Sequence, residues 1–457
     1  MAVQLKLNQS LTLKIKRLGI NGEGIAYYKR LIIFVKGTLP KETVIVKITK
    51  ATPRYAEAQL IQIKEASPDR VIPPCPVYDQ CGGCQLQHLA YKQQLVFKKD
   101  LLKQALEKYQ PAGYQQYELR KTIGMEEPWH YRNKAQFQLR ENLKTQKVEA
   151  GLYQSESHQL VPIVDCLVQE PATQKVMNTA TQLLTKYAIP IYDERKNSGI
   201  LRTLMVRVGI ETGEVQLVLI SRTKKLPQIN AFIRELNQRC PEVVSIMQNI
   251  QDKKTSIVMG DETIHLWGKE TIDEKINEVS FELSARAFFQ LNPKQTKVLY
   301  QEALDALALK QDKTVVDAYC GVGTIGLSLA KQAKEVRGMD VIPQAIDDAK
   351  KNAEQMGLTN THYEVGSAEE LLPKWFAEGF TPDAIVVDPP RTGLDDKLLQ
   401  AIVKQPSQQL VYISCNVSTL ARDLKPLSKI YNVEYLQSVD MFPQTARCEV
   451  VVKMTKK

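Results

Sequence analysis

The sequence predicts an α/β protein in which a doubly wound, Rossmann-like parallel sheet follows a small β-barrel and a central α+β region. From about residue 276 onward, apolar strand-like segments alternate with amphipathic helical segments. The first 64 residues are instead short strand-like segments separated by Gly, Pro and Asn turns. Because 457 residues are about three times the usual domain size, we expect a barrel over 1–65, a central domain over 66–275 and the α/β domain over 276–457.

The N-terminal barrel is predicted from strand-length runs over 11–18, 24–28, 31–37, 43–50 and 56–63. Residues 1–64 contain 12 Lys and Arg against three Glu, and so carry nine of the ten net positive charges of the chain. Tyr27, Tyr28 and Tyr55 lie among these basic residues. Basic side chains contact phosphates and aromatic rings stack on bases, so the pattern favours nucleic-acid binding; a solvated surface on a structural barrel is the alternative.

Three cysteines follow a proline-rich break at 67–74, and Cys75, Cys81 and Cys84 have the spacing C-x5-C-x2-C. Cys166 is a candidate fourth ligand. Four thiolates suit either zinc or an iron–sulfur cluster, and the spacing leaves these evenly matched; unligated cysteines are a third possibility. His88 is interpreted as a packing or surface histidine rather than a further ligand.

The central region mixes helical and strand-like patterns. Apolar residues recur at three- and four-residue steps over 86–109 and 173–188, which predicts helices. Strands are expected over 131–141, 147–154 and 203–210. Arg132 and Lys134, in the first of these strands, are candidates for holding a nucleic acid, and surface solvation is an equally good interpretation.

The C-terminal domain shows the alternation of a doubly wound sheet. Apolar strands are predicted over 314–320, 335–341, 361–366, 383–390 and 409–416. Two further strands, over 433–443 and 448–457, are joined by a short loop and predict an antiparallel pair at the edge of the sheet.

A nucleotide-cofactor site is predicted where the first strand of this domain meets its helix. Gly321, Gly323 and Gly326 fit G-x-G-x-x-G, whose glycines permit a tight turn and close approach to a ligand. Nineteen residues after Gly321, Asp340 ends the next strand, where a carboxylate can accept hydrogen bonds from ribose hydroxyls. Glycines that only permit strand–helix packing are the alternative. A nicotinamide dinucleotide and S-adenosylmethionine both satisfy this pattern.

An acidic, rigid loop follows the fourth strand of the domain. Asp388 precedes Pro389 and Pro390 at the carboxyl edge of the sheet, where open α/β folds bind their ligands. Many amino methyltransferases place an aromatic residue after such prolines to stack on the target base. Arg391 stands there instead, which argues against methylation of an exocyclic amine and leaves Asp388 free to contact a base or the cofactor.

Cys415 is the candidate nucleophile. It follows a strand and precedes a helix that Asn416 or Ser418 is expected to cap, so helix amides are expected to lower its pKa. A small buried cysteine is the alternative. Carbon 5 of uracil is a poor nucleophile, and thiolate addition at carbon 6 activates it towards a sulfonium methyl group. Such an adduct needs a base to remove the carbon-5 proton, and Glu449, at the start of the last strand, is the candidate.

Four segments occur in the order DAYCGVGTIG, VVDPPRTG, YISCNVSTLARDL and TARCE. With them the chain resembles the RumA/TrmA family of RNA uracil-carbon-5 methyltransferases over nearly its whole length. The resemblance implies S-adenosylmethionine as methyl donor, a TRAM domain with an oligonucleotide-binding fold in the N-terminal barrel, and a 4Fe-4S cluster. The last two features point to the branch that acts on 23S ribosomal RNA, because the bacterial transfer RNA branch generally lacks them.

The resemblance also assigns roles. It implies that Cys415 is the nucleophile and Glu449 the base. Cofactor-binding residues would be Gln290, Tyr319, Gly321, Gly323, Asp340 and Asp388. Cluster ligands would be Cys75, Cys81, Cys84 and Cys166. The family often has a histidine and an apolar residue directly before the base, where this chain has Arg447 and Cys448, so the environment of the base is expected to differ.

Composition is consistent with these expectations. The hydrophobic fraction of 43% and the charged fraction of 25% are ordinary for a soluble protein, and no segment contains the roughly 18 apolar residues of a membrane span. The first residues lack a signal-peptide core, which predicts a cytoplasmic protein with reduced thiols. No feature indicates an obligate protein partner.

Three alternatives to the methylation of ribosomal RNA stay open. They are the same reaction on transfer RNA, a non-catalytic RNA-binding assembly factor and, third, a dehydrogenase.

Overall fold

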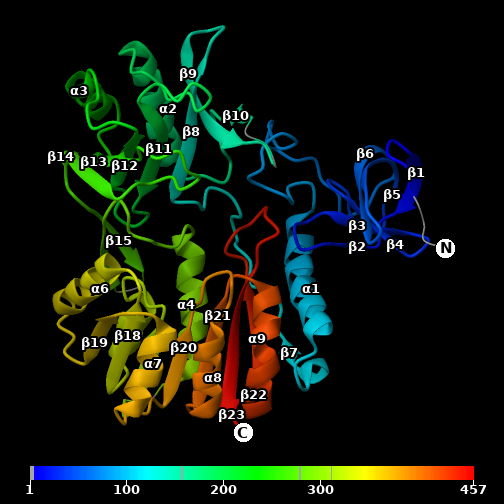
Figure 1. Ribbon diagram of the computed structural model, residues 1–457, viewed down its shortest axis with the longest axis vertical. Helices are drawn as coiled ribbons and strands as arrows, with labels where there is room; N and C mark the ends of the chain where they lie inside the picture. Colours follow the sequence, from blue (N-terminus) through cyan, green and yellow to red (C-terminus); the bar gives the residue numbers. More distant parts are fainter. Residues whose placement is uncertain (1–4, 156, 158, 277–278, 310) are drawn as a thin grey trace.

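The computed structural model describes residues 5–155, 157, 159–276, 279–309 and 311–457. It contains a small barrel, a central sheet and a larger C-terminal sheet, seen respectively at the right, top and bottom of Figure 1. No helix among these residues is long and apolar enough to cross a membrane.

The N-terminal barrel is built from six strands: β1 (Ser10–Lys14), β2 (Arg17–Leu18), β3 (Gly24–Tyr28), β4 (Leu31–Val35), β5 (Thr43–Ala51) and β6 (Tyr55–Glu65). Their order is β1-β5-β6-β4-β3-β2. The predicted strand 11–18 is divided at Ile15 and Lys16. The Lys16 amide donates to Ile25, so the chain leaves β5 and pairs with β3. That bend closes the sheet around a core of buried aliphatic residues such as Ile33, Val46 and Ile48.

The central sheet has the order β10-β9-β8-β11-β12-β13-β14. Its strands are β8 (Lys134–Asn142), β9 (Lys147–Tyr153), β10 (Leu160–Pro162), β11 (Leu201–Val208), β12 (Val215–Ser221), β13 (Val243–Ile250) and β14 (Glu262–Gly268). Helices α2 (Pro171–Lys186) and α3 (Ile229–Arg239) pack on it. A two-stranded ribbon of β15 (Ile272–Ile276) and β16 (Val279–Leu283) follows.

The C-terminal domain is the Rossmann-like α/β fold that the sequence predicts. Its sheet has the order β19-β18-β17-β20-β21-β23-β22-β7, and β17 to β21 are parallel. The strands are β17 (Thr314–Ala318), β18 (Glu335–Asp340), β19 (Thr361–Val365), β20 (Ala384–Val387), β21 (Gln409–Ser414), β22 (Tyr431–Val439) and β23 (Glu449–Lys456). The helices are α4 (Pro293–Leu307), α5 (Thr324–Ala330), α6 (Pro343–Gln355), α7 (Ala368–Ala377), α8 (Asp396–Lys404) and α9 (Val417–Ile430).

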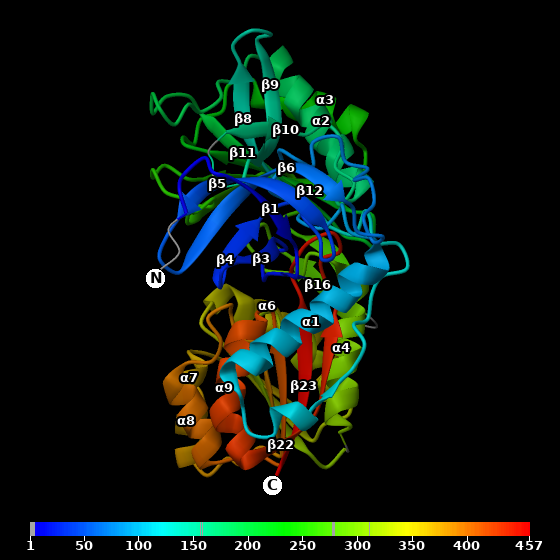
Figure 2. The same ribbon diagram turned by 90° about the vertical axis from the view of Figure 1, so that its right-hand side faces the viewer.

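A segment from before the central sheet completes the C-terminal domain. Helix α1 (Tyr91–Tyr109) lies along α9, and its Phe97, Leu101 and Leu102 share a core with residues of that helix (Figure 2). Strand β7 (Glu118–Leu119) then pairs with β22 at the edge of the sheet. The predicted antiparallel pair of β22 and β23 is present, but β7 lies outside it. Short-range sequence patterns do not encode such a long-range strand pairing.

Candidate active site

The predicted site residues of the C-terminal domain converge at one edge of its sheet. Asp340 ends β18, Asp388 directly follows β20 and Cys415 directly follows β21. Glu449 begins β23, which runs antiparallel to β21, so its first residue lies at the edge where the parallel strands end. Ser414 and Val450 form the last pair of this ladder, and Cys415 and Glu449 are the residues directly beyond it, close enough for the Glu449 charge to act on the Cys415 thiol.

The glycine-rich turn between β17 and α5 has the backbone geometry that its sequence predicts. Gly321 and Gly323 have φ values of 55° and 83°, in the left-handed region where glycine is favoured. Tyr319 adopts φ 67° without being glycine. The Gly321 amide donates to Oδ2 of Asp340 at 3.1 Å, and the Ile342 amide donates to its Oδ1 at 2.9 Å. Hydrogen bonds thus connect the glycine-rich turn directly to Asp340 at the end of β18.

The two carboxyl groups nearest Cys415 have raised pKa values. Burial raises the pKa of Asp388 to about 7. Burial and the nearby charge of Asp388 raise the pKa of Glu449 to about 8. A carboxyl group with a pKa near neutrality can both hold and release a proton under cellular conditions, which suits a general base.

The expectation of a lowered pKa for Cys415 is wrong for the free protein. Burial raises the pKa of its thiol to about 11, the carboxylates of Glu449 and Asp388 add to that rise, and the charge of Arg391 opposes it. The predicted helix cap is present, since the Asn416 side chain accepts from the Ser418 amide at 3.1 Å. Local helix amides are therefore outweighed by desolvation and by two negative groups that are distant in sequence.

Sequence reasoning missed two residues at this edge and one exposed aromatic residue two positions before Gln290. Asp317, buried within β17, accepts from the Gly326 amide at 2.7 Å, and its isolated charge in an apolar strand was an available signal. Tyr300 of α4 is buried and hydrogen-bonds to Gln290 and Thr324, close to Asp388 and Glu449. Phe288 is 67% exposed although it is large and apolar. Nothing in the helical pattern around Tyr300 distinguishes it from a core residue.

The four predicted ligand cysteines also converge. Cys75, Cys81, Cys84 and Cys166 line one cavity of about 80 Å³ between the cysteine segment and the central sheet. Burial raises the pKa of the Cys84 thiol to about 12, and nearby cysteines add to that rise. Among the described residues, no group of three or more His, Cys, Asp or Glu side chains is arranged to hold a metal ion.

Polar groups surround these thiols. The Gly83 amide donates to Sγ of Cys81 at 3.4 Å, and backbone amides of Val168 and Gln169 hydrogen-bond to Cys166. His88 does not line the cavity. Its Nδ1 lies 2.6 Å from the Tyr78 hydroxyl, in agreement with a packing role.

Comparison with known proteins gives consistent relatives. The family model described as tRNA (Uracil-5-)-methyltransferase matches residues 90–457, and the TRAM domain model matches residues 4–61. An uncharacterized RNA methyltransferase of Enterococcus faecalis is 71% identical over 99% of both chains. One of Listeria innocua is 54% identical over 98% of both chains.

Among solved structures, the tRNA (uracil-54, C5)-methyltransferase of Pyrococcus abyssi, in complex with S-adenosyl-L-homocysteine, is similar over almost the entire chain. Its TM-score is 0.77 at 26% identity, and the match covers 97% of this chain and 99% of that one. The similarity therefore extends over the barrel, the central sheet and the C-terminal sheet together.

Proposed function

The chain belongs to the tRNA (uracil-5-)-methyltransferase family and carries a TRAM domain, and on this premise we propose that it methylates carbon 5 of a uridine in 23S ribosomal RNA. Membership makes it an S-adenosylmethionine-dependent RNA methyltransferase of the uracil-5 type. The observation that carries the proposed mechanism is the β21–β23 ladder, in which Cys415 and Glu449 follow the pair Ser414–Val450 at the sheet edge next to Asp388.

In the proposed reaction, the Cys415 thiol gives its proton to the neighbouring carboxylate of Asp388, whose pKa is about 7. The resulting thiolate adds to carbon 6 of the uracil ring, and the displaced electron pair makes carbon 5 nucleophilic. S-adenosylmethionine supplies the methyl group that carbon 5 takes up. Glu449 then removes the proton left on carbon 5, the electron pair of that C–H bond restores the ring double bond, and the bond from carbon 6 to sulfur breaks to release the thiolate. The raised pKa of Glu449, about 8, suits this proton transfer.

The residues around the glycine-rich turn fit the methyl donor. Asp340 already accepts two backbone amides and has further lone pairs for ribose hydroxyls. Tyr319, Gly321 and Gly323 form the turn beside it, and Gln290 lies next to the Tyr300 hydroxyl. We assign these residues and Asp388 to the pocket shared by cofactor and target base.

The target uridine has to leave its stack to reach Cys415. Phe288, two residues before Gln290 and 67% exposed, offers a ring on which a displaced base can stack. Arg132 and Lys134 are assigned to RNA phosphates. Burial and the charges of Arg207 and Arg132 lower the pKa of Lys134 to about 8, so a phosphate would relieve the repulsion among these cations.

The four cysteines are proposed to hold a 4Fe-4S cluster. Their thiols line one cavity of about 80 Å³, and four thiolates around one cavity are the donor set of such a cluster. Amide donors to Cys81 and Cys166 suit thiolates bound to a cluster. Cys75 and Cys84 complete the donor set.

The choice of ribosomal RNA rests on the combination of TRAM domain and four-cysteine cavity. The same reaction on transfer RNA is the second candidate, because the Pyrococcus abyssi enzyme that resembles this chain over its whole length is named for tRNA uracil 54. The test is to incubate the purified protein with labelled S-adenosylmethionine and total RNA from a strain that lacks the gene. Label at carbon 5 of a 23S uridine is expected, and label confined to transfer RNA would exclude our choice.

A further inference from the structure

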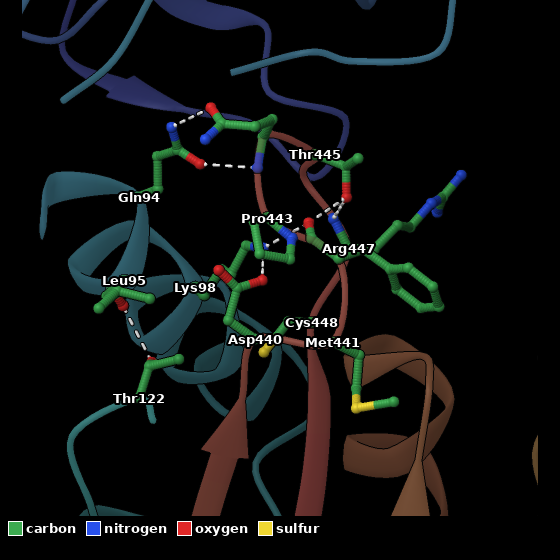
Figure 3. A network of polar contacts seen from close by, with 12 residues as sticks. Gln94, Leu95, Lys98, Thr122, Asp440, Met441, Pro443, Thr445, Arg447 and Cys448 are labelled. Atoms are coloured by element: carbon green, nitrogen blue, oxygen red, sulfur yellow. Dashed lines mark hydrogen bonds and ion pairs between the residues drawn. The ribbon is translucent and has the colours of Figure 1, made fainter. Parts of the chain in front are cut away.

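The loop of residues 440–448, here called the base loop, joins β22 to β23 and ends directly at Glu449. Val439 and Glu449 pair across the hairpin, so the loop closes immediately above the proposed base. Figure 3 shows the base loop beside α1, with Gln94 and Lys98 of that helix pointing towards it. The base loop therefore enters β23 directly at Glu449, and a shift of the loop acts on the first residue of that strand.

Five consecutive carbonyl groups of the base loop, from Asp440 to Gln444, accept hydrogen bonds from other parts of the chain. The donors and distances are Gln295 Nε2 to Asp440 (3.1 Å), Asn292 Nδ2 to Met441 (2.9 Å), Lys98 Nζ to Phe442 (3.0 Å), the Tyr131 hydroxyl to Pro443 (2.9 Å), and the amides of Gln85 (3.0 Å) and Leu86 (2.9 Å) to Gln444. They come from the cysteine segment, α1, the start of the central region and the beginning of α4.

An ion pair between Lys98 and Asp440 lies at the centre of this network. Both side chains are fully buried, with 0% exposure. The second Asp440 oxygen accepts from the Tyr91 hydroxyl at 2.9 Å. A buried charge that loses its partner is strongly disfavoured, so a movement of the base loop away from α1 that separates the pair is costly.

Gln444 forms the second anchor. Its backbone has φ 69°, a left-handed conformation that is unfavourable for glutamine and is held here by surrounding contacts. Its amide donates to Gln94 Oε1 at 3.0 Å, and its own Oε1 accepts from Gln94 Nε2 at 2.9 Å. The same Gln94 nitrogen donates to the carbonyls of Leu86 and Leu89 at 3.0 and 2.9 Å, which ties the cysteine segment to the loop.

We propose that Lys98, Asp440 and Gln444 are positioning residues that hold Glu449 in place for proton removal, with α1 and the cysteine segment as their support. The inference rests on the proposed function, because it concerns the step assigned to Glu449. Thiol addition and methyl transfer do not use the Glu449 carboxylate. Removal of the carbon-5 proton does use the Glu449 carboxylate. A displaced base loop therefore slows only this proton removal and the release of RNA that follows it, and methylated RNA stays attached to Cys415.

The first test is Lys98→Met in the full-length protein, with Lys103→Met, exposed on the same helix, as the matched control. Each variant is incubated with labelled S-adenosylmethionine and total RNA from the deletion strain, then treated with nuclease and separated on a denaturing gel. We expect label linked to the protein to rise, and release of free methylated RNA to slow about tenfold or more, only in Lys98→Met. Affinity for S-adenosylhomocysteine should equal that of the control.

Gln444→Gly is the second variant, because glycine keeps the left-handed backbone and removes only the side-chain link to Gln94. If Lys98→Met does not fold, the release of methylated RNA by Gln444→Gly tests the positioning role instead. Unchanged release of product, or a parallel decrease of protein-linked label and free product, would overturn the inference. The proposed function fails separately if Glu449→Gln also gives no protein-linked label.

Discussion

The carboxyl group of Asp388 lies close enough to Glu449 to raise its pKa, and both groups raise the pKa of Cys415. Three titratable groups with raised pKa values therefore meet at one sheet edge. A negative charge on one of these groups raises the pKa of the other two, so the protonation state of each group depends on the protonation of its neighbours. This arrangement makes the site sensitive to substitution of any member and to pH.

Stability should depend on pH through Glu449. Its pKa of about 8 in the folded protein lies above the roughly 4.3 of an unfolded glutamate, so the folded state binds the proton more tightly. The resulting contribution is present at low pH and is lost as pH rises through about 8. Glu449→Gln should reduce the fall in the thermal unfolding midpoint between pH 5 and pH 8. The exposed Glu378→Gln is the control, and equal slopes for all three proteins would contradict the assignment.

Cys415→Ala should abolish methyl transfer to uridine and all protein-linked label, because no covalent adduct can form. Binding of S-adenosylhomocysteine should remain, since the glycine-rich turn is untouched. Cys240→Ala, which alters a buried cysteine of the central core, should retain activity. Methylation at the wild-type rate by Cys415→Ala would exclude the covalent mechanism.

Asp340→Ala should weaken binding of S-adenosylhomocysteine about tenfold or more, since hydrogen bonds to a charged group contribute about 1.5–3 kcal/mol. It also removes the acceptor of the Gly321 amide. Isothermal titration against Asp347→Ala, an exposed aspartate on α6, measures the effect. Equal affinity in the two variants would remove Asp340 from the cofactor site.

Cys84→Ser should lower the iron and sulfide content of anaerobically purified protein and reduce its thermal stability. Cys84 lines the cavity with a thiol whose pKa is raised by burial, and a serine in its place would leave a cluster with three thiolates. Cys240→Ala serves again as control. If the wild-type protein contained stoichiometric zinc and no iron, the four cysteines would be a zinc site and the proposal of a cluster would be wrong.

The barrel should contribute electrostatically to RNA affinity. Lys29 and Arg30 are exposed in the turn between β3 and β4, and the Lys29 ammonium lies 5.6 Å from the Tyr28 ring centroid. Lys29→Gln/Arg30→Gln should weaken RNA binding and reduce the slope of log affinity against log salt by about 1–2. Lys397→Gln/Lys404→Gln, on exposed positions of α8, is the charge-matched control. Identical salt slopes would contradict a role for the barrel surface.

Sequence patterns identified the ends of strands as the sites of Asp340, Asp388 and Cys415, because parallel strands place such residues at one edge. They also identified the tight glycine-rich turn at Gly321. Tyr300 and Phe288 escaped notice, since one lies in an ordinary amphipathic helix and the other in an irregular segment. Their importance depends on neighbours that are distant in sequence.

The sequence by itself determined the α/β class, the closed basic barrel, the candidate nucleophile and base, and the family. Local periodicity, glycine spacing and short motifs suffice for these, because they reflect forces between residues close in the chain. Only the tertiary structure decided that α1 packs on the C-terminal domain and β7 extends its sheet, that the pKa of Cys415 is raised, and that Lys98 pairs with Asp440. Burial and long-range charge contacts produce those features, and neither exists until the chain has folded.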